Sequence, residues 1–373
     1  MIKNRRRSPV AMVNFRPLLK ETERQWRAHL REVRADMQFI LGKQVQEFER
    51  AFAQHLHARD CIGCGSGTSA IELCLRAANI TRRDQRVLTS AFSSPFTVQA
   101  ILAAGAQPVF ADVDPDFLLL DTEAAEPVMR KQVAAILPVH LYGQPCDLPK
   151  LLKLTRRNEA VLVQDACQAH GAEYEGIALT EFSPFVAYSF YPTKNLGCLG
   201  DGGAVATSSR TIAQRLRLLR DGGRRGDQLS RVIAVNSRLD ELQACFLRTF
   251  LPRLSEWNRA RASLAKAYDE ALTACDEVTP VRRTPDSVNH LYVIRVKRRE
   301  KLREFLISQG IQTGVHYPVP LHLHPAFAAF GPKRGAFPNA ERAARDAVSL
   351  PLHPYLHVSD IMRVADAIHR FYC

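Results

Sequence analysis

Lys194 lies in a segment whose composition would make a lysine amine reactive toward carbonyl groups. It is the only Lys between Lys153 and Lys266, and aromatic residues and glycines surround it in the sequence. No acidic residue is closer along the chain than Asp201. An ammonium group that loses water without gaining a charged partner has a lowered pKa, and its neutral amine is then a nucleophile. The segment predicts an imine-forming lysine, and the alternative is a surface lysine in a turn.

A glycine-rich turn over 63–70 opens an apolar helix that runs to about Ala78. Amide groups at a helix N-terminus and a Thr hydroxyl can bind a phosphate, because they offer several donors at the positive end of the helix dipole. The dinucleotide-binding pattern is not met, since the third Gly comes one residue early. A helix that is only capped, by Ser66 or Thr68, is the alternative for this segment.

Asp165 ends an apolar run that reads as a strand, and open α/β sheets bind their ligands at the carboxyl ends of strands. An ordinary Asp facing a loop is the alternative. Gln168 and His170 follow and offer further polar contacts.

These three segments together match the needs of pyridoxal phosphate. Its phosphate must be anchored, its ring nitrogen must be kept protonated by a carboxylate, and its aldehyde must be held by a Lys imine. Lys194 follows Asp165 by 29 residues, after the next predicted strand. No metal is expected, because the sequence has no H-E-x-x-H motif, no paired C-x-x-C motifs and no P-loop Lys.

Short apolar runs rich in β-branched residues alternate with helical segments over much of the chain. This spacing predicts βαβ units, a mostly parallel sheet covered by helices, and the doubly wound α/β class. Two helices, over 21–41 and 45–57, precede these runs. The expected strands are 86–89, 108–113, 134–141, 160–165, 186–190 and 203–207.

A long helical stretch over 238–273, interrupted only by Pro252, leads out of the first domain. The elements expected beyond it are a strand over 290–296, a helix over 301–309 closed by Gly310, a Pro-rich loop over 318–338 and a helix over 360–372. Loops of that length in a compact domain are usually functional. We therefore predict a basic arm over 1–15, a large α/β domain over 16–250 and a small α+β domain over 251–373.

The composition is that of a soluble globular protein, with 373 residues, 46% hydrophobic and 24% charged. No apolar run reaches the roughly 20 residues that span a bilayer. The nine scattered cysteines, of which only Cys61 and Cys64 are close, and the lack of a signal peptide predict reduced thiols and a cytoplasmic location.

The net charge of +13, with 40 Arg and 11 Lys, favours anionic partners. Residues 158–209 contain one Lys and no Arg, where an even spread would place about seven, so a basic shell around a basic-poor interior is expected. No nucleic-acid-binding motif is present, and no aromatic residues alternate with the basic runs. A nucleic-acid binder or a non-enzymatic regulator is therefore disfavoured.

Seven blocks of this sequence resemble the DegT/DnrJ/EryC1/StrS family of pyridoxal-phosphate-dependent aminotransferases. They occur in the family's order from about Gly42 to the C-terminus. The blocks are 66–68, 105–110, 139–144, 165–171, 189–197, 236–238 and 315–318.

The resemblance implies fold type I of the pyridoxal-phosphate-dependent transferases, a mostly parallel sheet with a smaller C-terminal domain. It implies a homodimer with active sites at the subunit boundary. The activity that it implies is transfer of an amino group from glutamate or glutamine to a keto group of a nucleotide-linked deoxysugar. A cyclitol ketone as acceptor and a non-catalytic regulatory member are the alternatives.

Residue roles follow from the resemblance position by position. Lys194 is similar to the Schiff-base lysine, and Asp165 to the partner of the ring nitrogen. Matching phosphate ligands are Gly67, Thr68 and Ser189; Gln168 matches a residue near the phenolic oxygen, and Asn236 one that reaches the phosphate in the neighbouring subunit. His316, Tyr317 and His322 fall where family members shape the substrate pocket.

Two departures from the family pattern affect these roles. The aromatic residue that usually stacks on the pyridine ring is replaced by Ser94, so Phe92 or Phe96 is expected to take over. The family's Arg-Asn-His-Gly turn reads Arg-Asp-Gly-Gly at 220–223. Lys194 is retained, whereas related sugar dehydratases have His at this position.

Overall fold

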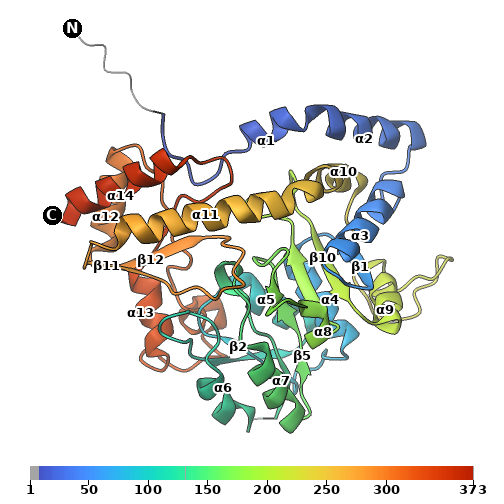
Figure 1. The fold of residues 1–373 in the computed structure, drawn as a ribbon. Coiled ribbons are helices and arrows are strands. Elements are labelled where there is room, and N and C mark those ends of the chain that lie inside the picture. Colours follow the sequence, from blue (N-terminus) through green and yellow to red (C-terminus); the bar gives the residue numbers. More distant parts are fainter. Residues whose placement is uncertain (1–7, 131, 373) are drawn as a thin grey trace.

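The computed structural model describes residues 8–130 and 132–372, in which a large α/β unit is joined to a smaller unit by a long helix (Figure 1). The helices of the large unit are α1 (Arg16–Glu21), α2 (Glu23–Asp36), α3 (Lys43–His55), α4 (Gly67–Ala77), α5 (Pro95–Ala104), α6 (Thr122–Met129), α7 (Leu148–Arg157), α8 (Leu179–Phe182), α9 (Arg210–Arg220) and α10 (Glu241–Phe250), with a 3₁₀ turn η1 (Leu141–Gly143). No helix of the described ranges is long and apolar enough to cross a membrane.

The large unit is built on one twisted sheet. Its strands are β1 (Asp60–Cys64), β2 (Arg86–Ser90), β3 (Gln107–Ala111), β4 (Val133–Ile136), β5 (Val161–Leu162), β6 (Gln164–Asp165), β9 (Val186–Ser189) and β10 (Gly203–Thr207), beside a small ribbon of β7 (Glu173–Tyr174) and β8 (Ile177–Ala178). Two four-stranded sections, β1-β10-β9-β6 and β3-β2-β4-β5, meet at Val163, whose N–H donates to the carbonyl of Ile136 (2.9 Å). All expected strands are present.

The direction of the strands brings three segments to one edge of the sheet. Strand β10 is antiparallel to both of its neighbours, β1 and β9, whereas the other pairs of this sheet are parallel. Strands β1, β9 and β6 therefore point the same way. Gly67 and Lys194, in the segments that follow β1 and β9, and Asp165, the last residue of β6, therefore lie at the carboxyl ends of these strands. The prediction of a mostly parallel, helix-covered sheet is confirmed.

Both faces of the sheet are buried, which explains why its strands are almost continuously apolar. Along β10, Val205 packs with α4, α5 and α9, while Ala204 and Ala206 pack on the other side with α3 and α10. The core thus holds the sheet rigidly between two layers of helices.

The predicted break at Pro252 is confirmed. Helix α10 ends at Phe250, a 3₁₀ turn η2 (Leu251–Arg253) contains the proline, and α11 (Leu254–Leu272) continues into the small unit. That unit pairs β11 (Val278–Pro280), β12 (Tyr292–Val296) and β13 (Ala347–Leu350) antiparallel and packs them with α12 (Arg299–Ser308), α13 (Pro338–Asp346) and α14 (Val358–Tyr372). The Pro-rich loop contains two 3₁₀ turns, η3 (Leu321–Leu323) and η4 (Pro325–Phe327).

The N-terminal segments differ from the sequence-based expectation. Residues 1–7 of the expected basic arm lie outside the described residues, and the rest of the arm is attached to the small unit. Val10 is buried, its N–H donates to Gly310 (2.9 Å) and its carbonyl accepts from Gln312 (3.0 Å). The helix expected over 21–41 ends at Asp36, because Met37 adopts a left-handed conformation (φ 51°).

Glu241 connects α10 to the start of α3. Its buried carboxylate accepts hydrogen bonds from the backbone N–H groups of Gly42 (2.8 Å), Gln44 (2.8 Å) and Val45 (3.0 Å). These are N–H groups that a helix leaves without an intrahelical partner at its first turn. The side chain that caps α3 therefore comes from a residue 196 to 199 positions later in the sequence than the N–H groups it binds.

We expect Glu241→Gln to lower the free energy of unfolding by about 2–4 kcal/mol, because an amide cannot accept all three buried N–H groups. Urea unfolding of both proteins measures the difference. Glu47→Gln is the control: this half-buried residue of α3 forms only a surface ion pair with Arg50, so the change should alter stability by less than about 0.5 kcal/mol. Equal stability of Glu241→Gln and the unsubstituted protein would show that this cap is dispensable.

Candidate active site

Lys194 lies in the tight loop between β9 and β10. Its N–H donates to the carbonyl of Tyr191 (2.9 Å), and the N–H of Cys198 donates to the carbonyl of Phe190 (2.8 Å). A Cβ at Gly197 would lie 2.3 Å from the carbonyl oxygen of Pro192, so the loop closes only around a glycine.

Asn195, the next residue, anchors this loop to other parts of the fold. Its amide nitrogen donates to Asn258 on α11 (2.9 Å) and to the carbonyl of Val288 (3.0 Å). Its side-chain oxygen lies 3.0 Å from Nδ1 of His290, which donates to it. The backbone that carries Lys194 is thereby fixed to the joining helix and to the small unit.

Burial lowers the pKa of the Lys194 ammonium below its ordinary value of 10.5, and the thiol of Cys167 and the carboxylate of Asp165 act in the opposite direction. Within the described ranges no carboxylate forms an ion pair with this amine. The direction of the shift agrees with the sequence-based expectation. A larger share of neutral amine is available at Lys194 than on an exposed lysine.

Asp165, at the end of β6, is a buried carboxylate held by neutral donors. Thr97 on α5 donates its hydroxyl to Oδ2 (2.9 Å), and the N–H of Cys167 donates to Oδ1 (3.1 Å). No Lys, Arg or His in the described part of the chain forms a salt bridge with it. Since a carboxylate can accept about four hydrogen bonds and its burial is costly without a cation, Asp165 is suited to a cationic ligand group.

The N-terminus of α4 lies against the end of β9. Ser66 caps the helix by accepting from the N–H of Ser69 (3.1 Å), and Gly67 and Thr68 form the first helical positions. A Cβ at Gly67 would lie 2.5 Å from Cβ of Ser189 and 2.9 Å from the sulfur of Cys167, so the helix approaches the strand this closely only with glycine. Free helical N–H groups and the Ser189 hydroxyl therefore meet at one point, which fits a phosphate.

Gln168, which is buried, and Tyr317, which is half-buried, form a hydrogen-bonded pair near this edge. Gln168 accepts from the N–H of Tyr142 (2.8 Å) and donates to the Tyr317 hydroxyl (3.1 Å), which also bonds to Ser94. Burial raises the pKa of Tyr317 to about 12. The ring of Phe92 lies edge-on to Tyr317 with centroids 6.4 Å apart.

The two phenylalanines considered for stacking occupy different environments. Phe92 is fully buried in the core, whereas Phe96 is 64% exposed on α5. Of the two, Phe92 is the one in contact with the residues of the site.

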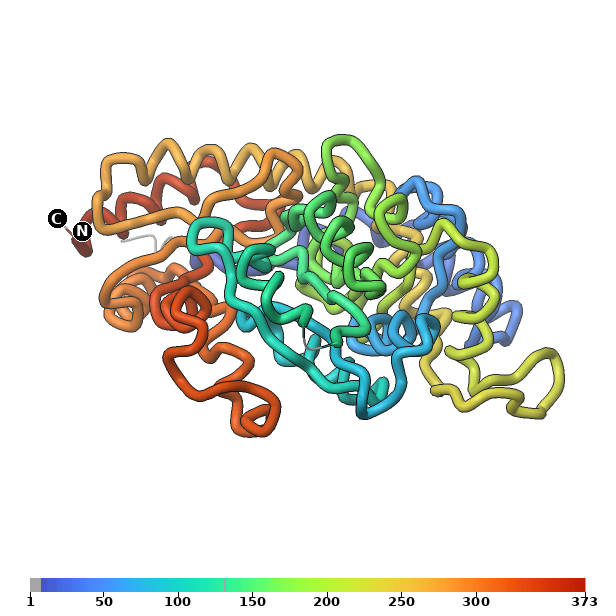
Figure 2. Tube along the Cα trace, turned by 90° about the horizontal axis from the view of Figure 1, so that it is seen from below, coloured from blue at the N-terminus to red at the C-terminus, as the bar shows by residue number. Residues whose placement is uncertain are grey.

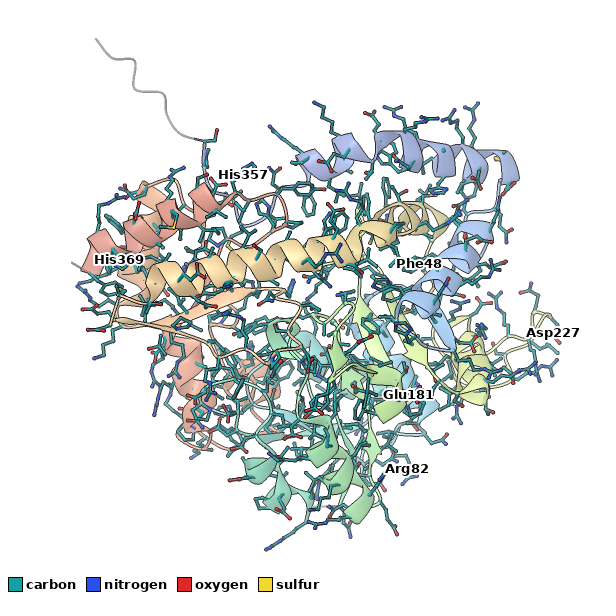
Figure 3. All side chains as sticks on the ribbon, viewed as in Figure 1. Phe48, Arg82, Glu181, Asp227, His357 and His369 are labelled. Atoms are coloured by element: carbon teal, nitrogen blue, oxygen red, sulfur yellow. The ribbon has the colours of Figure 1, made fainter. Side chains whose placement is uncertain are left out.

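The other three predicted residues, His316, His322 and Asn236, have different surroundings from one another. His316 bonds to the Ser349 hydroxyl (2.8 Å), and burial, assisted by the charge of Lys194, lowers its pKa to about 4. His322 is buried elsewhere, bonded to Glu341 (3.2 Å). Asn236 is exposed at the base of the loop over 221–236, which extends away from the body of the protein with Asp227 at its outer end (Figures 2 and 3).

The site thus joins Lys194, Asp165, the α4 N-terminus and the Gln168–Tyr317 pair. In the described part of the chain the side chains of His322 and Asn236 form no hydrogen bond with these groups, although Ser237, next to Asn236, accepts from the N–H of Gly65 (3.0 Å). The unpaired buried carboxylate, the desolvated amine and the glycine-lined helix start fit a phosphorylated aromatic aldehyde with a basic ring nitrogen. Within the residues that the structure describes, no group of three His, Cys, Asp or Glu could hold a metal ion.

Sequence reasoning missed Thr97, Asn195 and Asn258. Thr97 precedes Asp165 by 68 residues in the sequence. The two side chains meet because Thr97 lies on α5, the helix that follows β2, and β2 belongs to the same sheet as β6. The single signal for Asn195 was its position next to Lys194.

In the cofactor-free protein, Lys194 should become reactive toward acetic anhydride at a lower pH than Lys150. Only the neutral amine reacts, burial lowers the pKa of Lys194, and Asp147 raises the pKa of Lys150. Competitive labelling between about pH 7 and about pH 11, read by peptide mass spectrometry, gives both titrations. The control Lys194→Ala should lose that one labelled peptide, and a Lys194 titration at or above that of Lys150 would contradict its desolvation.

Comparison with known proteins identifies the family. Residues 20–369 match the DegT/DnrJ/EryC1/StrS aminotransferase family. A dTDP-3-amino-3,4,6-trideoxy-alpha-D-glucose transaminase of Streptomyces venezuelae is 38% identical over 364 residues, 97% of this chain and 96% of that protein. A Geobacillus stearothermophilus protein named pleiotropic regulatory protein is 40% identical over 349 residues, 92% of this chain and 93% of that one.

The crystal structure of S. venezuelae DesV in complex with a ketimine intermediate matches with a TM-score of 0.94 and 37% identity, over 98% of this chain and 99% of that one. The predictions of fold class, cofactor and enzyme class are confirmed. This chain belongs to the DegT/DnrJ/EryC1/StrS aminotransferase family, whose members use pyridoxal phosphate.

Proposed function

We propose that this aminotransferase transfers an amino group from glutamate or glutamine to the keto group of a nucleotide-linked deoxysugar. The observation that carries the proposal is the buried, unpaired carboxylate of Asp165 at the same sheet edge as the desolvated amine of Lys194. The nucleotide-sugar acceptor is supported by the activity for which the S. venezuelae relative is named and by the net charge of +13.

Residues of the large unit would hold the cofactor. The N–H groups of Gly67 and Thr68 and the hydroxyl of Ser189 bind its phosphate, and Asp165 holds a proton at its ring nitrogen. Gln168, fixed by Tyr142 and Tyr317, lies where it can donate to the phenolic oxygen. When bound, pyridoxal phosphate supplies an electron sink for the carbon that loses a proton.

Lys194 has two tasks in this proposal. Its Nζ would hold the cofactor in the absence of the amino donor, and once free the neutral amine would move a proton away from the donor's α-carbon. The tight loop and Asn195 keep this amine at one position, so no large rearrangement is needed between the two tasks. Alternate binding of donor and acceptor gives ping-pong kinetics.

His316 and Tyr317 are the proposed substrate contacts of the small unit, because both lie near Lys194 or Gln168. A substrate contact of His322 stays a prediction, since its ring bonds to Glu341. Phe92 is the proposed aromatic neighbour of the cofactor.

A homodimer would complete the site. The loop over 221–236 exposes Leu229 (64%), Val232 (43%) and Ile233 (91%), and an apolar group of this kind on a projecting loop favours a protein partner. Asn236 at the base of that loop is the residue proposed to reach the partner's phosphate. Asp221, in the altered turn, bonds to Arg224 (2.7 Å) and Arg238 (2.8 Å) and so fixes the loop base. The cytoplasmic location stays a prediction.

The name of the Geobacillus relative keeps the regulatory alternative open to test. A regulator has no need of a desolvated lysine beside an unpaired buried carboxylate, and both are present here. Catalysis is therefore the better supported function.

A panel of keto substrates tests the acceptor class. With glutamate as donor, a dTDP- or UDP-linked keto sugar should give 2-oxoglutarate in step with an aminated product, and a cyclitol ketone should give at least about tenfold less, because it lacks the charged nucleotide. Coupled detection of 2-oxoglutarate and mass spectrometry of the product follow both. Equal turnover of the cyclitol ketone would overturn the nucleotide sugar as the proposed acceptor. No turnover with any ketone would favour a regulator.

Asp165→Asn should still bind the cofactor but lose about 10²-fold or more in the half-reaction with glutamate, because the preorganised negative charge at the ring nitrogen is gone. Stopped-flow absorbance of the cofactor measures this single step. Asp201, an exposed acid that follows Lys194 in the loop between β9 and β10, provides the matched control, and Asp201→Asn should react at the normal rate. An unchanged half-reaction in Asp165→Asn would refute the role of this carboxylate.

A further inference from the structure

A pocket of about 300 Å³ lies beside Lys194 at the junction of the two units. Its walls come from the N-terminal segment over 12–15, the loop over 192–197, helix α11 and the small unit. Two cationic side chains, Lys194 and Arg261, line it, and no Asp or Glu does. An aminotransferase must bind its donor next to this lysine, so the charge of the pocket bears on the donor's chemistry.

Arg261 is a buried cation without a carboxylate partner. It is 6% exposed, and its Nη1 donates to the carbonyls of Leu352 (2.7 Å) and His290 (3.3 Å). Its Nε has no hydrogen-bond partner, and no described acidic side chain forms an ion pair with it. Burial lowers its pKa to about 10, so it stays charged at neutral pH.

A side chain that served only to bridge the carbonyls of His290 and Leu352 would not need a positive charge. A guanidinium has five N–H donors in a rigid fork, of which two carbonyls use only part. Leaving a buried cation with neutral acceptors alone is costly, and an anion with two oxygens removes that cost. The free donors of Arg261 therefore indicate an anionic ligand.

The other polar groups of the pocket are neutral. Burial lowers the pKa of His316 to about 4 and that of His353 to about 4, and it also lowers the pKa of His290. At neutral pH Arg261 is thus the fixed positive charge of this pocket, while Lys194 exchanges its proton during the reaction.

The shape of the pocket favours a small ligand. Met12, Val13 and Phe15 contribute apolar side chains to its lining. Its volume is at the lower end of the range for small-molecule sites, and a nucleotide-linked sugar is several times larger than an amino acid. A short carbon chain ending in a carboxylate matches both the apolar lining and the fixed cation.

We propose that Arg261 binds a carboxylate of the amino-acid donor in this pocket. The inference rests on the proposed function, because it assumes an amino-acid donor. To the proposed function it adds two features of the donor site: Arg261, on the helix that joins the two units, as a binding residue, and the N-terminal segment over 12–15 as part of the lining. The ligand class is a short α-amino acid with a further polar end, such as glutamate, and its 2-oxo acid product.

Binding of an unreactive analogue to the holoenzyme tests this site separately from catalysis. By isothermal titration calorimetry, glutarate should bind at least about tenfold more tightly than its neutral diamide, glutaramide, because a buried charged hydrogen bond is lost with the diamide. Arg261→Gln should weaken glutarate by at least about tenfold and leave glutaramide and dTDP unchanged. Arg259→Gln, two positions away on α11 and exposed, is the matched control and should bind like the unsubstituted enzyme.

Each outcome decides the proposal. Equal affinities for glutarate and glutaramide in the unsubstituted enzyme would overturn it, and so would a loss of dTDP rather than glutarate affinity in Arg261→Gln, which would assign the cation to the acceptor's phosphates. Arg261→Lys keeps the charge but not the fork, so it should lose part of the affinity. If neither variant folds, the glutarate-to-glutaramide ratio decides. Glutarate binding through Arg261 without any amino transfer would refute the proposed function alone, and transfer without this binding would refute the donor site alone.

Discussion

The structure depends on the burial of one carboxylate that no cation of the described chain neutralises. Asp165 is enclosed at the end of β6 with Thr97 and the N–H of Cys167 as its donors. An isolated charge in such a place costs several kcal/mol unless a partner arrives. The basic-poor stretch over 158–209 explains why the surrounding strands and loops bring no arginine to it. The remaining capacity of the carboxylate is kept for a ligand, and the opposite charge nearby belongs to Lys194.

The topology of the sheet places these groups together. Because β10 runs antiparallel to both β1 and β9, the strands β1, β9 and β6 point the same way. The start of α4, the loop that carries Lys194 and the carboxylate of Asp165 therefore meet at one edge of the sheet. Each comes from a different part of the sequence, and each is fixed by backbone contacts that tolerate little substitution. Gly67 and Gly197 are examples, because a Cβ at either position would overlap a neighbouring strand or turn. The site is therefore a property of the rigid core.

Local patterns were sufficient to predict the strands, the glycine-rich helix start, the broken helix at Pro252, and the positions of Asp165 and Lys194 at or after the ends of neighbouring strands. These features are encoded within short windows of sequence. Contacts between distant segments were not predictable in that way: Thr97 reaches Asp165 only through sheet order, and Glu241 caps a helix nearly two hundred residues earlier. Strand β13 was missed because four residues leave almost no periodic signal, whereas α13 has a clear amphipathic pattern that was overlooked after the Pro-rich loop.

Helix α11 ties the two halves of the site to each other. Asn258 on this helix bonds to Asn195, beside the lysine, and Arg261, less than one turn further, lines the pocket at the junction of the two units. A displacement of the small unit relative to the sheet would move the guanidinium and strain the lysine loop at the same time. The negative charge of Asp165 in the large unit and the positive charge of Arg261 at the joint therefore keep a fixed separation. A ligand that is cationic at one end of the site and anionic at the other is oriented by this pair before any bond changes, because both charges are held by the fold and neither is screened by bulk water.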